Sequence, residues 1–151
     1  MIKKTFKEVR ELNVAISQYF KRISTAEQTK LGYALKRISD TEIKKVLGEY
    51  REAYDKLAFE NLEKPAIELA LVDKVTGAVL MAPKGSERVY QYNKENLVKV
   101  MEVEKNFQKI ANDLIDDFDK KEFDIEPYLV KEIPEDLLPK EVEAFKGFVL
   151  E

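Results

Sequence analysis

The chain has 151 residues, of which 44% are hydrophobic and 36% charged, and its 26 basic and 29 acidic side chains give a net charge of −3. This composition is typical of one globular domain, and the near balance of charge argues against a uniformly basic nucleic-acid binder. Because the chain has neither cysteine nor histidine, the sequence excludes thiol nucleophiles, Ser-His-Asp triads, imidazole general bases, zinc fingers and other soft-metal sites.

Residues 1–64 are predicted to form a helical hairpin. Thr5 followed by Glu8 has the spacing of a capping box, which predicts the start of a first helix. Ser24 followed by Glu27 repeats that spacing and predicts a second helix after a very short connection, so the two helices are expected to run antiparallel. A mostly apolar stripe recurs at steps of three and four along the first helix: Phe6, Val9, Asn13, Ile16, Phe20 and Ile23.

The second helix is predicted to run from about residue 26 to 62, which is long for a globular domain. Its apolar side chains form two stripes whose centres are turned by roughly 100° from each other. The segment 39–42 lies between the stripes, and we expect a kink, a 3₁₀ turn or a break into two stacked helices there. The stripes consist of Leu31, Leu35 and Ile38, and of Ile43, Val46, Leu47, Tyr50, Tyr54 and Leu57.

Residues 65–92 are predicted to form a β-hairpin or small antiparallel meander. Pro65 is expected to end the helical region, and the apolar period then changes to the alternation of strands at 66–72, 78–81 and 88–92. Turns are expected at 73–77, where Gly77 can adopt a positive φ, and at 83–86.

A third helix is predicted over residues 93–121 with Asn93 as its N-cap, followed at 122–151 by an extended tail and a short helix from about 140 to 149. The predicted fold class is α+β. It combines a helical hairpin with a long kinked second helix, a small antiparallel β-meander, a third long helix and a short C-terminal helix. No internal repeat or low-complexity linker divides the sequence, so residues 1–151 are expected to form a single domain.

Four basic residues of the second helix recur at seven-residue steps and form a candidate partner-binding ridge: Lys30, Arg37, Lys44 and Arg51. On a straight helix such positions drift by only about 20° per heptad and stay on one face. A ridge of this kind could follow a nucleic-acid backbone or meet an acidic partner. The alternative is a solvated helix face that pairs with nearby carboxylates such as those of Glu27, Asp40 and Asp55.

A second candidate partner-binding segment is acidic and consists of Asp113, Asp116, Asp117, Asp119 and Glu122. Aspartates at the carboxyl end of a helix oppose the helix dipole, so we expect either fraying or a partner at this end. The segment lacks the register of an EF-hand, and a solvated helix end is the alternative interpretation. No metal, cofactor or catalytic residue is assigned.

The chain resembles a family of small uncharacterised proteins of tailed bacteriophages and prophages. The resemblance lies in ELNVAI at 11–16, YALKR at 33–37, the hairpin at 73–77, the Ile-Pro pair at 133–134 and EVEAF at 141–145. The hairpin insert between residues 65 and 92 departs from that family. The resemblance implies a non-enzymatic role in particle assembly or in interference with host machinery, and it carries over no functional residue.

These observations lead to three functional hypotheses. The first is a phage-encoded, non-enzymatic protein-interaction module that binds a larger phage or host protein or copies of itself. The second is an inhibitor of a host nucleic-acid-handling enzyme that acts through the acidic segment. The third is direct nucleic-acid binding through the basic ridge, and a metal-dependent hydrolase is the remaining alternative. We expect the protein in the host cytoplasm or in the virion, with no membrane association.

Overall fold

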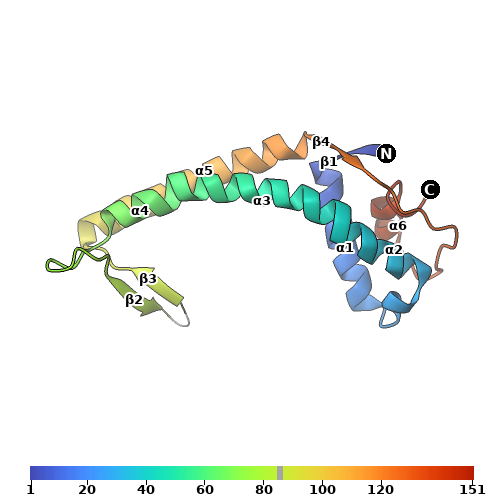
Figure 1. Cartoon of the computed structure of the whole chain (residues 1–151), viewed down its shortest axis with the longest axis horizontal. Coiled ribbons are helices and arrows are strands. Elements are labelled where there is room, and N and C mark those ends of the chain that lie inside the picture. The colour runs from blue at the N-terminus through green and yellow to red at the C-terminus, as the bar shows by residue number, and fades with distance from the viewer. Residues whose placement is uncertain (85–86) are drawn as a thin grey trace. The chain divides into compact units, whose positions relative to one another are not determined.

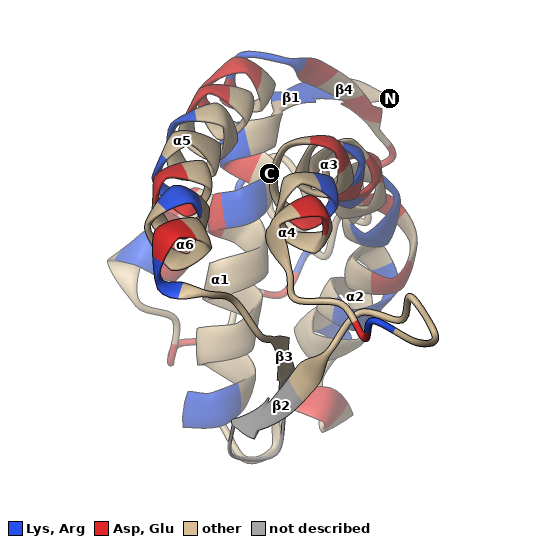
Figure 2. Ribbon diagram, turned by 90° about the vertical axis from the view of Figure 1, so that its left-hand side faces the viewer, with Lys and Arg blue, Asp and Glu red and all other residues tan. Residues whose placement is uncertain are grey.

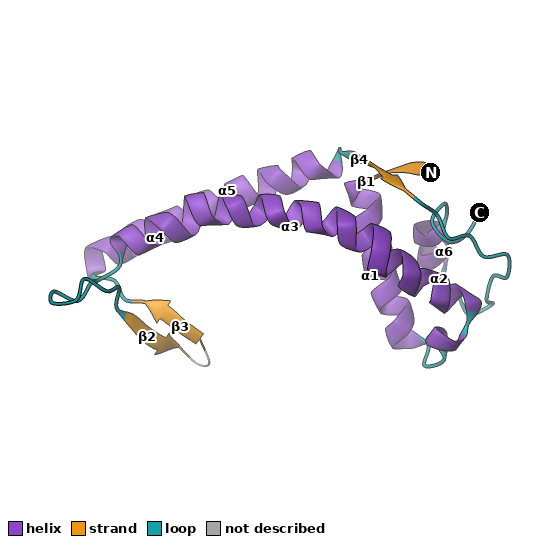
Figure 3. Ribbon diagram, in the orientation of Figure 1, coloured by secondary structure: helices purple, strands orange, loops and turns teal. Residues whose placement is uncertain are grey.

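The computed structural model describes residues 1–84 and 87–151, and within them the chain is mostly helical with two small antiparallel two-stranded sheets (Figures 1 and 3). The α-helices are α1 (Phe6–Arg22), α2 (Lys30–Ile38), α3 (Lys44–Ala58), α4 (Lys64–Leu69), α5 (Lys94–Asp119) and α6 (Pro139–Phe145). The strands are β1 (Ile2–Thr5), β2 (Met81–Lys84), β3 (Glu87–Tyr90) and β4 (Glu122–Ile125). This content is compatible with the α+β class in its coarse form.

The chain groups into two compact units. Unit 1 consists of residues 1–51 and 116–151, and unit 2 consists of residues 52–115. The single-domain organisation expected from the sequence stays a prediction, and the two units are described separately.

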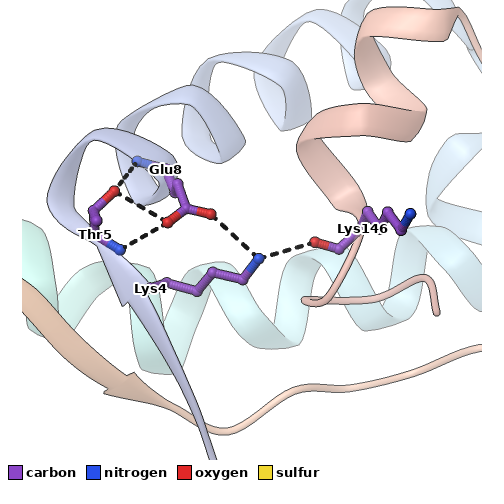
Figure 4. Close-up of polar contacts among 4 residues, drawn as sticks. All are labelled: Lys4, Thr5, Glu8 and Lys146. Atoms are coloured by element: carbon purple, nitrogen blue, oxygen red, sulfur yellow. Dashed lines mark hydrogen bonds and ion pairs between the residues drawn. The ribbon is translucent and has the colours of Figure 1, made fainter.

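The amino end of α1 has the predicted capping box. The Glu8 backbone N–H donates to Thr5 Oγ1 at 3.2 Å, and the Thr5 N–H donates to Glu8 Oε1 at 3.1 Å. Lys4 Nζ adds contacts of 3.3 Å each to Glu8 Oε2 and to the Lys146 carbonyl oxygen (Figure 4). Burial alone would raise the pKa of Glu8, but the Thr5 N–H and the Lys4 ammonium lower it below its ordinary value. A short network therefore joins the start of the chain to its end.

Strands β1 and β4 pair antiparallel, with Ile2 opposite Ile125 and Thr5 opposite Glu122 (Figure 1). The sequence places residues 122–125 in an extended tail, and the structure adds that they pair as a strand with β1. Alternation within four residues is too weak a signal to predict a strand whose partner lies more than a hundred residues away. The sheet leads directly into the core of unit 1, because the Phe6 N–H donates to the Lys121 carbonyl at 3.0 Å.

The core of unit 1 is built largely from aromatic side chains. The fully buried Phe6 ring has its centroid 5.1 Å from that of Tyr50 and 5.4 Å from that of Phe118. Tyr19 of α1 meets Phe145 of α6 edge-on at 6.1 Å. Such tilted and edge-to-face arrangements are favourable ring geometries, and they hold α1, α3, α5 and α6 to one another.

The C-terminal helix α6 ends at Phe145, earlier than the predicted residue 149. Gly147 has a φ of +83°, in the left-handed region that ends helices, and the chain then turns back so that Phe148, Val149 and Leu150 are buried. Residues 148–150 therefore pack in the core of unit 1 and do not continue the helix.

The second helix starts later than its sequence predicts, because Ser24 and Glu27 do not form a capping box. A short 3₁₀ turn (Ala26–Gln28) follows α1, and Thr29 is the N-cap of α2, with its Oγ1 accepting from the Gly32 N–H at 2.9 Å. A Cβ on Gly32 would lie 1.7 Å from the Ala26 carbonyl oxygen, so this close approach of turn and helix requires glycine.

Between α2 and α3 the backbone forms a π-helical segment, Ser39–Ile43. The expected irregularity therefore takes the form of a π-helical segment and not of a 3₁₀ turn. A π turn accommodates one extra residue, which rotates the following helix by about 100° relative to an unbroken α-helix. The same angle separates the two predicted apolar stripes, and the segment brings them onto one buried face formed by Leu31, Leu35, Ile38, Ile43 and Val46.

Helix continues beyond Pro65, so the predicted strand at 66–72 is wrong over its first residues. A second π-helical segment, Phe59–Glu63, leads directly into α4 (Figure 3). Pro65 lies in the first turn of α4, where a missing N–H is tolerated and the fixed φ suits a helix. The proline therefore begins a helical segment instead of ending one.

The hairpin region of unit 2 contains β2 and β3 and a bridge between Val72 and Val79. At the turn between them, Gly77 has a φ of +72° and donates its N–H to the Asp73 carbonyl at 2.8 Å. Asp73 Oδ1 also accepts from the backbone N–H groups of Val75 and Thr76. The turn expected at 83–86 lies partly outside the described residues.

Helix α5 starts with the predicted cap, since Asn93 Oδ1 accepts from the Asn96 N–H at 2.8 Å. The Asn96 side-chain amide donates to the Leu69 carbonyl at 3.0 Å and so joins the start of α5 to the end of α4. Within unit 2, Phe107 of α5 packs against Tyr54 of α3 with ring centroids 5.6 Å apart.

Candidate functional site

An open groove of 520 Å³ lies on unit 1 between α2 and the extended segment 128–130. We call it the tyrosine groove. Two tyrosine rings, two cationic side chains, one carboxylate and three apolar side chains line it: Tyr33, Tyr128, Lys30, Arg37, Glu27, Ala34, Leu129 and Val130.

The local sequence explains how α2 contributes to this groove. Lys30, Tyr33, Ala34 and Arg37 are spaced by three and four residues, so they share one side of the helix. Leu31 and Leu35, which lie between them, and Ile38, which follows Arg37, are buried in the core of unit 1 and fix the orientation of α2. Amphipathicity thus sets which α2 side chains line the groove.

The opposite wall is held by the carboxyl end of the chain. The N–H groups of Tyr128 and Val130 donate to the carbonyl oxygens of Phe148 and Val149, both at 2.8 Å. Because Phe148 and Val149 are buried, this short extended segment is anchored to the core although no regular sheet includes it.

Arg37 and Tyr128 form the main contact across the groove. The guanidinium carbon of Arg37 lies 4.7 Å from the centroid of the Tyr128 ring, within the range of a cation–π interaction. The Tyr128 side chain, with a smaller contribution from Tyr33, raises the pKa of Arg37 above its ordinary value. The guanidinium, like that of any arginine, is charged at every physiological pH. Tyr33 lies beside it and keeps 65% of its surface exposed.

The structure divides the predicted basic ridge into two pairs. Lys30 and Arg37 line the tyrosine groove, whereas Lys44 and Arg51 do not. The π-helical segment between Arg37 and Lys44 turns their relative direction by about 120° where a straight helix would give about 20°. The expectation of one continuous ridge assumed a straight helix and is wrong for that reason; the binding role of these residues stays a prediction.

The predicted acidic segment is also divided. Asp119 accepts from Arg10 Nε at 3.0 Å and Nη2 at 2.6 Å, so this carboxylate forms a bidentate pair within unit 1. Asp113, Asp116 and Asp117 are exposed on the last turns of α5, and Glu122 lies in β4 opposite Thr5.

Charges of both signs are distributed along α5 (Figure 2). In residues 1–84 and 87–151, no group of three or more acidic side chains is placed to hold a metal ion.

A second hollow, of 690 Å³, lies on unit 1 between α1 and α6. Several of its charged groups are already paired, Lys4 with Glu8 and Arg10 with Asp119. Its other charged side chains are Glu11, Lys140, Glu143 and Lys146.

A buried polar cluster escaped the sequence analysis altogether. Arg22 of α1 contacts the Glu141 carboxylate and donates to the Asp136 carbonyl at 2.9 Å, and Glu141 Oε1 also accepts from the Leu138 N–H. The Tyr19 hydroxyl and Glu141 Oε2 are buried without a hydrogen-bond partner among the described residues. Burial, followed by the charge of Asp136, raises the pKa of Tyr19. No local signal links residues separated by more than a hundred positions, so only the fold reveals this cluster.

Unit 2 exposes an extensive set of large apolar side chains. We call them the unit 2 apolar surface: Leu97, Val98 and Met101 of α5, with Leu71, Val72, Leu80, Met81 and Val89 at the hairpin end. Among the unit 2 residues whose side chains are described, the fully buried hydrophobic ones are Ala66, Val100 and Phe107. Leu97 and Met101 are thus exposed on the same helix that buries Val100 and Phe107.

No protein-family model, curated protein or solved structure matches the chain. The resemblance to phage proteins therefore stays a prediction. Within the part of the chain that the structure describes, no helix combines the length and apolar character needed to cross a membrane.

Proposed function

We propose that this chain is a non-enzymatic protein-interaction module that presents surfaces to other proteins. The observation that carries the proposal is the contrast between the few buried side chains of unit 2 and the many large apolar side chains that it exposes. Leu97, Val98 and Met101 lie close together on α5, and exposed apolar side chains that gather in this way mark contact surfaces.

Three apolar side chains of α5 are exposed close to one another. Leu97, Val98 and Met101 expose 48%, 66% and 62% of their surface on successive turns of α5. Covering these three side chains would contribute roughly 3–5 kcal/mol through removal of apolar area from water. A partner protein or a second copy supplies such a cover, and the nearby charges of both signs on α5 do not oppose it.

The resemblance to phage proteins supplies the biological setting of the proposal. The module would be phage-encoded and would act in the host cytoplasm or in the virion, either in particle assembly or against host machinery. Genes encoded beside this one would separate these roles, since structural genes favour assembly and early genes favour host interference.

Site-specific photo-crosslinking tests the proposal. A photo-reactive amino acid at Val98 should form a covalent adduct with a protein, in the purified sample or in host lysate. The same group at Lys109, which is exposed on the same helix outside the apolar surface, should not. A chain that is monomeric at high concentration and forms no adduct from either position would contradict the proposal.

A second proposal is inhibition of a nucleic-acid-handling host enzyme. The exposed carboxylates of Asp113, Asp116 and Asp117, at steps of three and four on the last turns of α5, favour it because such a row can imitate phosphates. Replacing Asp116 and Asp117 by Asn should abolish inhibition of a sensitive nuclease or polymerase, whereas replacing Glu102 by Gln should leave it unchanged.

A further inference from the structure

The tyrosine groove combines features that suit one class of ligand. Its apolar lining includes Ala34, which is almost fully buried, and Leu129, which is half exposed. Tyr33 lies beside them with most of its surface in solvent. An apolar side chain of a ligand can therefore be covered by the groove without displacing any core residue.

Two cationic groups flank the apolar part of the groove. Lys30 is 3.5 Å from Glu132, but both side chains are about three-quarters exposed. Exposed pairs of this kind contribute little and are readily exchanged, so Lys30 can turn to a carboxylate of a ligand. Arg37 is held against Tyr128 and keeps its planar guanidinium available for hydrogen bonding.

The spacing of the two cations predicts the form of the ligand. Lys30 and Arg37 are seven residues apart on α2, which places their Cα atoms about 10 Å apart along the helix axis. A peptide in the extended polyproline II conformation rises by about 3.1 Å per residue with three residues per turn, so carboxylates three residues apart lie on one side of it and match this distance. One of the two intervening side chains can then lie against Tyr33 and Leu129.

The same groove suits nucleic acid less well. Arg37 covers one face of Tyr128, so this ring is less available as a stacking platform for a base. Glu27 adds a negative charge to the lining, which opposes any anionic ligand, and it opposes a backbone charged at every nucleotide more than a peptide with two carboxylates. Two cations are also few for a backbone that carries a charge at every nucleotide.

We propose that the tyrosine groove binds an extended protein segment with the pattern acidic-x-x-acidic and an apolar residue between the two acids. The proposal rests on the function as a protein-interaction module and assigns a partner chemistry to one surface of it. Lys30 and Arg37 bind the two carboxylates, while Tyr33, Ala34 and Leu129 cover the apolar side chain.

Selection from a display library of random 12-residue peptides, with the full chain as bait, tests the chemistry directly. Enrichment of acidic residues three positions apart around an apolar residue is the expected result. An unbiased or basic set of selected peptides would overturn the proposal.

Fluorescence anisotropy with a labelled synthetic peptide then tests the site. The peptide has Glu-Leu-Ser-Glu at its centre, and a peptide of the same composition with adjacent glutamates is its control. Lys30→Glu and Arg37→Glu should each lower affinity by about tenfold or more, and Tyr33→Ala by a similar factor. Lys36→Glu is the matched control, because Lys36 is exposed on the same helix outside the groove and its variant should bind normally.

Each result of the binding test has a clear meaning. Equal affinity for the two peptides, or equal binding by the Lys36 and Arg37 variants, would overturn the groove assignment. Binding of a labelled (dT)12 oligonucleotide that needs Lys30 and Arg37, without peptide binding, would overturn it in favour of nucleic acid. Adducts from Val98 report on the unit 2 apolar surface, so the function as an interaction module can survive failure of the groove.

Discussion

Unit 1 and unit 2 use the same kinds of residue in opposite ways. In unit 1, aromatic rings from α1, α5 and α6 are buried against one another, and buried polar groups tie the carboxyl end to α1. In unit 2, Phe107 packs against Tyr54, while apolar side chains of α5 and the hairpin region stay exposed. The difference predicts that unit 1 carries most of the stability, and it is the observation behind the proposed role of unit 2 in association.

Replacement of core aromatic residues is expected to give the largest effect. Phe6→Ala should lower the free energy of unfolding by about 3–5 kcal/mol, because it leaves a cavity among three aromatic neighbours. Phe107→Ala in unit 2 should cost about half as much, since few other unit 2 side chains are fully buried. Urea unfolding measures both values, and equal losses of unfolding free energy in the two variants would contradict the difference between the units.

Loss of the buried carboxylate of Glu141 is expected to be the next largest effect. Glu141→Gln should destabilise the chain by about 2–3 kcal/mol, because it removes the partner of Arg22, a cation that is only partly exposed. Glu143→Gln on the same helix is the control and should change stability by less than about 0.5 kcal/mol. Thermal unfolding of the two variants in parallel checks the prediction, which fails if they cannot be distinguished.

Two glycines of unit 1 differ in the space around them: Gly32 is closely packed and Gly48 is not. Gly32→Ala should destabilise by about 2 kcal/mol, since the new Cβ would overlap the Ala26 carbonyl and the backbone must move. Gly48→Ala should stabilise by about 0.5–1 kcal/mol, because nothing lies within 4 Å of the new Cβ and alanine favours helix. Opposite shifts of the unfolding midpoint are expected; shifts of one sign would contradict the described packing.

The smallest expected effect concerns pH. The folded chain lowers the pKa of Glu8, so its contribution to stability is present above the ordinary carboxyl value of about 4.5 and is lost as pH falls through the lowered folded value. The contribution should stay below about 1 kcal/mol, because 44% of the side chain is exposed and solvent screens it. Glu8→Gln should therefore flatten the acid side of the stability profile measured by urea titration between pH 2 and 7. An unchanged profile would remove Glu8 from this role.

Signals confined to a few residues predicted structure correctly. The capping box of Thr5 and Glu8 and the Asn93 cap have donor and acceptor within three residues of each other. Chain geometry alone brings such groups together, so their spacing is sufficient information. The same reasoning failed at Ser24 and Glu27, where the adjacent Thr29 caps the helix instead.

The offset of about 100° between the two apolar stripes could also be recognised in the sequence, and it located the helix irregularity that the structure has at residues 39–43. Its consequence for the basic residues was not foreseen, because the rotation that aligns Ile38 with Ile43 also separates Arg37 from Lys44. Exposed residues at seven-residue steps make few packing contacts, so their spacing does not determine how the helix is turned. The buried apolar residues determine it.

The groove itself depends on contacts that no local pattern encodes. Tyr128 reaches Arg37 only because the tail is hydrogen-bonded to Phe148 and Val149, and Glu141 meets Arg22 across a similar span of chain. Caps, turns and amphipathic faces thus follow from the order of residues, since their partners are close along the chain. Pairing of β1 with β4, burial of Glu141 and the walls of the groove follow from how distant segments pack, because many partners compete and the core selects among them.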